Sequence, residues 1–187
     1  MTARRVPIIP TIIVLAAVAT MIALGVWQLG RLAEKETLIA RYTAAAGEGE
    51  VAAFPLGGTG EDVLFRRSQV ACAEVEKIEA VSGTSARGQK GWVHRATCSV
   101  SPGAVVMVDL GYSRDLAKPG FAGGAITGII APGPRLVADP PQAGLEAMAK
   151  PDPGDLPNNH LAYAGQWFFF ALTALVIYVL ALRRRRG

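Results

Sequence analysis

Histidine and cysteine are scarce in this chain, and the motifs of most common active sites are missing. The 187 residues include two histidines and two cysteines. No Cys-x-x-Cys pair and no close set of histidine ligands is found, which argues against a zinc or thiol-redox site. A phosphate-binding glycine loop, a nucleophile elbow and paired catalytic carboxylates are also missing. We therefore expect a protein that is not an enzyme.

Acidic residues are absent from both ends of the chain. All 15 lie between Glu34 and Asp155, whereas Arg4, Arg5 and Arg183–Arg186 add positive charge at the ends. The middle of the chain is therefore mildly acidic, although the formal net charge is +4. This distribution argues against a nucleic-acid binder. The basic ends instead indicate membrane topology.

The first of two long stretches without charged residues is Val6–Gly30. It is too long for the apolar core of a cleaved signal peptide. It predicts a transmembrane helix over residues 8–29, and residues 30–46 continue the helical period as an extension beyond the membrane. Trp27 is expected at the lipid–water interface, with Arg31 one turn later on the same side of the helix.

The second charge-free stretch, Leu161–Leu182, reaches roughly 33 Å as a helix, enough to cross a hydrocarbon core. It predicts a second span over residues 160–182. The arginines beyond each span place residues 1–7 and 183–187 in the cytoplasm by the positive-inside rule. Residues 47–159 then lie outside. The short start leaves no room for a transit peptide, so we expect a multi-pass protein of a bacterial inner membrane with a periplasmic domain.

The external domain is expected to consist of β-strands. Its apolar and β-branched runs alternate with glycine- and proline-rich turns and predict strands at 61–65, 69–73, 77–82, 92–100, 104–110 and 125–130. Residues 131–159 contain many prolines and predict an irregular return to the membrane, with one short helix over 142–149. The fold class is thus membrane α+β, with two transmembrane helices flanking a small, mostly antiparallel β domain.

Cys72 and Cys98 both fall in predicted strands of this domain. In an oxidising periplasm a disulfide is the favoured state, and it would stabilise the fold by roughly 3 kcal/mol. Two buried thiols are the alternative.

His160 is the sharpest chemical feature, because it stands at the mouth of the second span. Neutral imidazole is a good ligand for heme iron, and Tyr163 and Trp167 follow on the same helix face and could pack on a porphyrin. Arg31 could neutralise a heme propionate at the same membrane face. The alternatives are a helix cap with an aromatic belt, and an arginine that reaches the headgroups or pairs with Glu34.

Four other polar residues have simpler interpretations. Gln28 and Gln166 could form a hydrogen bond between the two spans. His94 is expected to be a solvated or hydrogen-bonded surface residue of a strand, and Asp109 a carboxylate that organises a turn at a strand end.

Both ends of the chain resemble signatures of the surfeit locus protein one (Surf) family. Gly25–Ile39 is similar to its opening pattern, Gly-x-Trp-Gln-x-x-Arg followed by a lysine and a Leu-Ile pair, and Asn158–Phe168 is similar to its closing pattern, Asn-x-His-x-x-Tyr-Ala-x-x-Trp-Phe. Gly88–Trp92 and Val105–Tyr112 fit the two central strand blocks. In the second of them, Leu110-Gly111-Tyr112 replaces the usual Arg-Gly-Trp.

The resemblance implies an assembly factor for heme-copper cytochrome c oxidase, which binds heme a transiently and helps its insertion into the catalytic subunit. His160 would be the ligand of the heme iron, while Trp27, Arg31, Tyr163 and Trp167 would provide packing and charge compensation. The catalytic subunit, heme a synthase and the lipid bilayer would be its partners. A stable accessory subunit of the oxidase or of a respiratory supercomplex, without heme of its own, is the alternative. A two-span sensor ranks last, because only five residues follow the second span.

Overall fold

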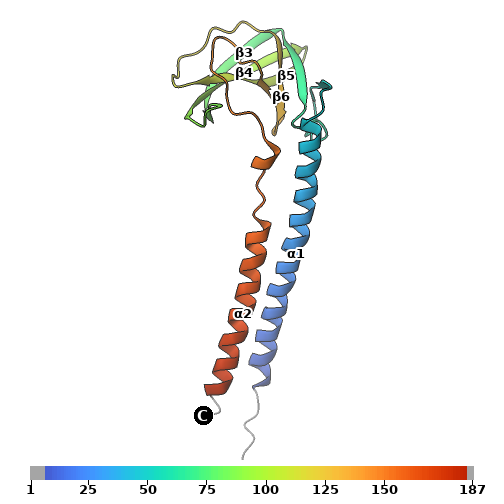
Figure 1. Ribbon diagram of the computed structural model, residues 1–187, viewed down its shortest axis with the longest axis vertical. Coiled ribbons are helices and arrows are strands. Elements are labelled where there is room, and N and C mark those ends of the chain that lie inside the picture. The colour runs from blue at the N-terminus through green and yellow to red at the C-terminus, as the bar shows by residue number, and fades with distance from the viewer. Residues whose placement is uncertain (1–6, 185–187) are drawn as a thin grey trace, which may run out of the picture. The chain divides into compact units, whose positions relative to one another are not determined.

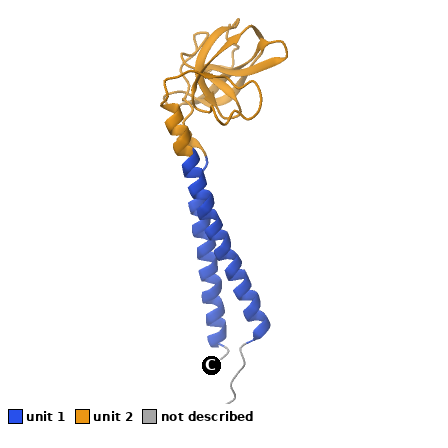
Figure 2. Ribbon diagram, turned by 90° about the vertical axis from the view of Figure 1, so that its right-hand side faces the viewer, with its two compact units in different colours: residues 1–38, 157–187 blue, residues 39–156 orange. Residues whose placement is uncertain are grey.

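The chain divides into two compact units, which are described separately. A computed structural model describes residues 7–184. The helical unit comprises the first part of the chain, up to Leu38, and the segment from Pro157 onward, and the β domain comprises Ile39–Leu156 (Figure 2). The terminal arginines Arg4, Arg5, Arg185 and Arg186, on which the predicted orientation depends, lie outside the described residues.

The β domain is built on one seven-stranded sheet (Figure 1). Its strands are β1 (Ala52–Ala53), β2 (Arg67–Cys72), β3 (Glu74–Thr84), β4 (Lys90–Ser101), β5 (Ala104–Ser113), β6 (Gly124–Ala131) and β7 (Arg135–Ala138). They lie in the order β1-β2-β6-β7-β5-β4-β3. The long strands β3, β4 and β5 form an antiparallel meander, in which Arg95 lies opposite Asp109.

The sheet is mixed, so the prediction of a mostly antiparallel domain is wrong. After β5 the chain crosses over through residues 114–123, and β6 pairs with β2 instead of with β5. The hairpin that follows brings β7 back between β6 and β5, where it runs parallel to β5. The short strand β1 also pairs in parallel, with β2. A strand inserted by a crossover leaves no local pattern in the sequence, and β7 has only four residues among prolines.

Two other segments differ from the sequence-based expectation. Residues 61–65 form a turn instead of a strand; Phe65 has a φ of 66° and packs on Tyr42 with ring centroids 5.2 Å apart. Residues 142–149 form no helix. The backbone of this part of the return segment (residues 139–156) bonds to neighbouring strands instead, with Tyr112 and Glu146 exchanging two hydrogen bonds. Helical hydrogen bonds cannot form where the same N–H and C=O groups complete a sheet.

The core of the β domain lies on the inner face of the sheet. Its fully buried members come from five strands: Val70, Cys72, Ala96, Cys98, Val106, Val108, Leu110, Ile126, Leu136 and Ala138. Within this core Cys72 and Cys98 form a disulfide, with their Cα atoms 5.1 Å apart. The bond joins β2 to β4, which are not neighbours in the sheet. It therefore links the two strands that lie next to the edge strands β1 and β3.

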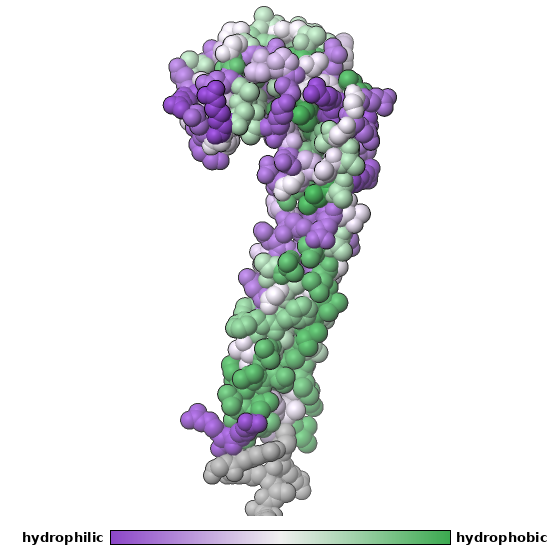
Figure 3. Space-filling view, in the orientation of Figure 1, coloured by the Kyte–Doolittle hydropathy of each residue, from purple (hydrophilic) through white to green (hydrophobic). Residues whose placement is uncertain are grey.

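The helical unit consists of the first part of α1 (Ile8–Ala46) and of α2 (His160–Arg184). Both helices are long and apolar enough to cross a membrane. Their large aliphatic and aromatic side chains are mostly exposed, and Figure 3 shows hydrophobic surface along the pair. A helix that keeps apolar side chains on its outside is typical of a lipid environment and not of a soluble core.

Small residues let the two helices approach closely. Gly25 on α1 and Ala164 and Ala171 on α2 are buried, and the ring of Phe168 lies directly over Gly25. Farther along the pair, Thr11 and Tyr178 share a hydrogen bond between their hydroxyl groups. Close packing of small residues and interhelical hydrogen bonds are the two main forces that hold helices together in a bilayer.

A leucine at Gly25 is expected to push the helices apart. A Cβ at this position would lie 2.6 Å from Cε1 of Phe168, which is closer than real side chains allow. We expect the interaxial distance to grow from about 8 Å to about 10 Å, the upper end of the usual range. Distances between spin labels at the exposed positions Leu15 and Leu175 measure this directly.

Gly30→Leu is the matched control, because a Cβ at Gly30 meets no atom within 4 Å. The control is expected to keep the wild-type label distance. An unchanged distance in Gly25→Leu would show that the ring of Phe168 moves aside and that Gly25 does not set the separation of the helices.

Candidate functional site

The two helices are joined near one end by a hydrogen bond between His160 and Gln28. His160 is the first residue of α2, and Gln28 lies on α1 within the same helical unit. Nδ1 of His160 lies 2.7 Å from Oε1 of Gln28. Both side chains are partly buried. Gln28 therefore pairs with His160, and the predicted bond between Gln28 and Gln166 is wrong; the side chain of Gln166 is exposed.

This hydrogen bond determines which nitrogen of the imidazole is free. An amide oxygen can only accept a hydrogen bond, so Nδ1 carries the proton and donates it to Gln28. In the neutral ring the lone pair is then on Nε2, the atom that ligates a metal. A second partner that holds the other ring nitrogen is the usual arrangement of metal-binding histidines, because it sets the tautomer and the ring orientation. Nε2 is thus the ring nitrogen of His160 that makes no hydrogen bond within the described residues.

The other candidate residues are found on the same two helices. Trp27 and Tyr163 are 56% and 51% exposed, which leaves their rings available to a flat ligand or to lipid. Trp167 is half-buried and contacts the edge of Phe170, at 6.4 Å between ring centroids. Arg31 forms an ion pair with Glu34, and both side chains are more than half exposed. An exposed pair of this kind is weak, so Arg31 can exchange Glu34 for another carboxylate.

The start of α2 also leaves one polar atom without a partner. The backbone carbonyl of Asn159 accepts the first helical hydrogen bond, from the N–H of Tyr163. Oδ1 of Asn158 is buried and makes no hydrogen bond within the described residues. The unpaired oxygen of Asn158 is an acceptor and does not suit a carboxylate. The free imidazole nitrogen, the exposed aromatic rings and the Arg31 guanidinium are the groups that fit a porphyrin with carboxylates at its polar edge.

A second polar cluster lies inside the β domain, and the sequence-based reasoning missed it. Asp109 is a buried residue of β5, not a turn residue: its carboxylate binds Nε and Nη2 of Arg95 at 2.6 and 3.1 Å, and Nε of Arg135 at 2.8 Å. The hydrogen bonds that Arg95 donates to Asp109 raise the pKa of the Arg95 guanidinium above its ordinary value. His94 is not a surface residue either. It is 1% exposed, and Nε2 lies 3.2 Å from the carbonyl oxygen of Asp115.

The pairing of residues across neighbouring strands is the information from which part of this cluster can be predicted. Arg95 and Asp109 are direct partners in the β4–β5 pair, and Arg135 is brought alongside by the parallel pairing of β7 with β5. Pairing of β4 with β5 can be inferred from the short turn between them. The contribution of Arg135 requires knowledge of the crossover.

Asparagine at position 109 is expected to destabilise the β domain. It removes the negative charge that the guanidinium groups of Arg95 and Arg135 share. These two side chains, 22% and 29% exposed, then stay partly buried without a charged partner. We expect the free energy of unfolding to fall by about 2 kcal/mol, less than for a fully buried ion pair. The unfolding temperature should then fall by roughly 6–10 °C. Thermal unfolding followed by circular dichroism measures it.

Glu76→Gln is the control, because Glu76 is exposed on β3 and forms no ion pair within the described residues. Little change is expected there. Equal unfolding temperatures for Asp109→Asn and wild type would show that the network does not stabilise the sheet.

Comparison with known proteins identifies the class to which this architecture belongs. The chain contains two apolar helices, with a mixed β domain between them in sequence. A histidine is the first residue of the second helix. A match to the SURF1 family covers residues 15–172. The protein belongs to the SURF1 family, as the resemblance of its two ends implies. This family is associated with the assembly of cytochrome c oxidase and is not a known enzyme class. No curated protein matches the chain.

Proposed function

We propose that the chain is an assembly factor that binds heme a and helps its insertion into the catalytic subunit of a heme-copper cytochrome c oxidase. The hydrogen bond from Nδ1 of His160 to Gln28 is the observation that carries this proposal. It leaves Nε2 as the free nitrogen in a chain whose family is associated with oxidase assembly. His160 would hold the heme, because a neutral imidazole nitrogen is a good ligand for heme iron.

The remaining residues of the site have complementary roles in this proposal. Trp27, Tyr163 and Trp167 offer aromatic surface to the porphyrin ring. Arg31 offers its guanidinium to a propionate in exchange for Glu34, since both are carboxylates. The protein makes and breaks no covalent bond of the substrate. Its contribution is to hold an apolar, reactive cofactor at one place in the membrane until the acceptor takes it.

The same proposal includes a location and partners. Both helices cross the inner membrane of a bacterium, with both ends in the cytoplasm and the β domain in the periplasm. Two apolar helices of sufficient length and the arginines beyond each of them support this arrangement. The disulfide of the β domain fits an oxidising compartment. The catalytic subunit would receive the heme and heme a synthase would supply it.

Deletion of the gene and affinity purification of the tagged chain test the proposal. Without the protein, we expect purified oxidase to contain less heme a per catalytic subunit, while heme a itself remains present in the membrane. With the tagged chain, we expect substoichiometric recovery of oxidase and heme a in the absorbance spectrum. A resident subunit would give a different result: one copy per mature oxidase, without heme of its own. That result, or normal heme a content after deletion, would refute the assembly role.

A further inference from the structure

The β domain contains a cavity of about 340 Å³ that is separate from the residues of the proposed heme site. It lies where strands β3, β4, β5 and β7 meet the return segment. Part of its wall is apolar and consists of Phe65, Val81, Val93 and Val137. The polar part includes Arg95, Asp109 and Arg135, together with Lys150, Asp152 and Asp155 of the return segment. A volume of this size is at the lower end of the range found for small-molecule sites.

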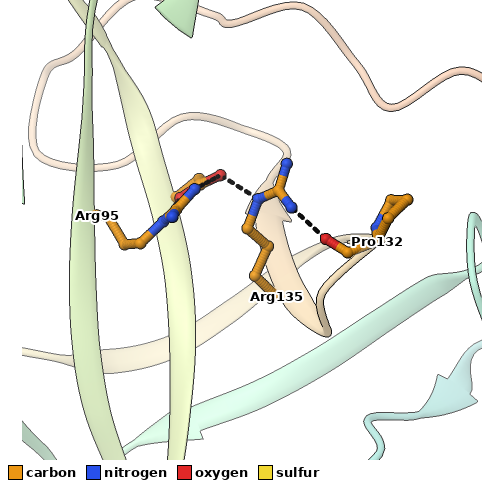
Figure 4. A network of polar contacts seen from close by, with 4 residues as sticks. Arg95, Pro132 and Arg135 are labelled. Carbon is orange, nitrogen blue, oxygen red and sulfur yellow. Dashed lines mark hydrogen bonds and ion pairs between the residues drawn. The ribbon is translucent and has the colours of Figure 1, made fainter. Parts of the chain in front are cut away.

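The polar part of the wall is held in one arrangement by its own contacts. Arg95 and Asp109 form a two-point pair, and Arg135 binds the same carboxylate through Nε. Arg135 is fixed a second time, because its Nη1 donates to the carbonyl oxygen of Pro132. Figure 4 shows the Arg135 guanidinium between the carboxylate and this carbonyl group. The guanidinium groups are therefore positioned before any ligand arrives.

Both guanidinium groups keep unused donors. Nη1 of Arg95 and Nη2 of Arg135 make no hydrogen bond within the described residues. Neither atom is among the buried polar atoms that lack a partner, so both keep access to solvent. Since Arg95 and Arg135 line the cavity, these donors are available to a molecule that enters it.

The charges of the cavity indicate what kind of molecule fits. Two arginines share one carboxylate, so the network carries one uncompensated positive charge. Lys150 also lines the cavity but is bound to Asp139 at 2.7 Å. Asp152 and Asp155 of the return segment line it as well and oppose any ligand with several negative charges. The charged side chains of the lining therefore balance, three positive against three negative, and what suits a ligand is the pair of free guanidinium donors, which match one carboxylate on an otherwise apolar molecule.

We propose that this cavity binds a small monocarboxylate with an apolar body. The carboxylate accepts hydrogen bonds from the free guanidinium nitrogens of Arg95 and Arg135, and the body lies against the apolar wall. This site is independent of heme binding and would exist in a chain that carries no heme. The β domain would then bind a ligand other than heme.

Titration of the full-length protein in lipid nanodiscs with 4-phenylbutyrate tests the proposal. This probe has one carboxylate and an apolar body of suitable size, and 4-phenylbutanamide is its neutral counterpart. We expect saturable binding of the carboxylate, seen by calorimetry and by a rise in the unfolding temperature of the β domain. The affinity for the amide is expected to be lower by about tenfold or more, because a charge-assisted hydrogen bond is lost.

Three variants locate the binding. Arg135→Met keeps an unbranched apolar stem but removes the guanidinium group and its charge, and it is expected to weaken 4-phenylbutyrate binding by about tenfold or more. Ala149→Trp changes no charge and fills the cavity from an exposed position of the return segment; it is expected to weaken binding equally. Lys77→Gln removes a positive charge from an exposed position of β3 outside the cavity and is expected to leave binding unchanged.

Three results would overturn the proposal: no saturable binding of 4-phenylbutyrate, equal binding of acid and amide, or wild-type affinity in Ala149→Trp. If Arg135→Met does not fold, the Ala149→Trp variant alone decides where the probe binds.

Discussion

Replacing His160 by alanine is expected to remove heme a from the purified protein. The proposed site offers one imidazole to the iron, and the only other histidine, His94, is 1% exposed in the β domain with its Nε2 already bonded to a carbonyl group. The aromatic rings that remain would hold a porphyrin only by packing. We expect little or no heme a in preparations of His160→Ala from cells that synthesise it. Oxidase heme a content is expected to fall as after deletion of the gene.

The Gln28→Leu variant tests the role of the hydrogen-bond partner of His160 while His160 itself is kept. It keeps the imidazole but removes the acceptor that fixes its tautomer and orientation. Loss of such a supporting partner commonly weakens metal binding by about 10- to 100-fold. Gln166→Leu makes the same change at an exposed position of α2 and is expected to keep wild-type heme content. Absorbance of the purified variants at equal protein concentration compares them. Equal heme content in His160→Ala and wild type would refute the ligand role.

Removing both cysteines is expected to cause the largest loss of stability. The disulfide closes a loop between positions separated by 26 residues and joins two strands that are not neighbours in the sheet. On loop-entropy arguments a closed loop of this length contributes about 3.5 kcal/mol. For a domain of this size the unfolding temperature should fall by roughly 10–15 °C. Alanine suits both positions, because both side chains are buried.

A reducing agent provides the matched control for this prediction. The chain contains two cysteines, so reduction can act only on this bond. Wild-type protein in dithiothreitol is expected to unfold near the temperature of the Cys72→Ala/Cys98→Ala variant, and the variant is expected not to respond. A variant as stable as oxidised wild type would mean that the bond does not stabilise the domain.

Much of the helical unit follows from local sequence. The charge-free stretches predict both helices, because a hydrophobic helix needs no partner to be recognisable. The extension beyond residue 29 is also predicted, and α1 continues to Ala46. The pairing of Gln28 with His160 is different. Each residue can be placed near the same membrane face, but the sequence does not distinguish His160 from Gln166 as the partner, since this depends on how the helices rotate against one another.

The β domain is predictable in its strands more than in its topology. Residues 92–100 and 104–110 are apolar and β-branched runs bounded by turn residues, and β4 and β5 contain them. The crossover that inserts β7 depends on long-range pairing and has no local signature. For this reason Arg135 could not be placed beside Asp109, and the cavity they line was not foreseen. The sequence predicts an irregular return with a short helix over residues 142–149, and this helix does not form because the backbone there pairs with strands that are distant in sequence.

The most direct measurement of the central claim is the identity of the axial ligand of bound heme a. Protein labelled with nitrogen-15 only at histidine, purified with heme a and studied by hyperfine spectroscopy of the ferric iron, reports whether an imidazole nitrogen is coordinated. The account predicts a directly coordinated histidine nitrogen in the wild-type protein that is absent from His160→Ala. A heme a complex without a histidine nitrogen on the iron, or one that keeps it in His160→Ala, would contradict the account.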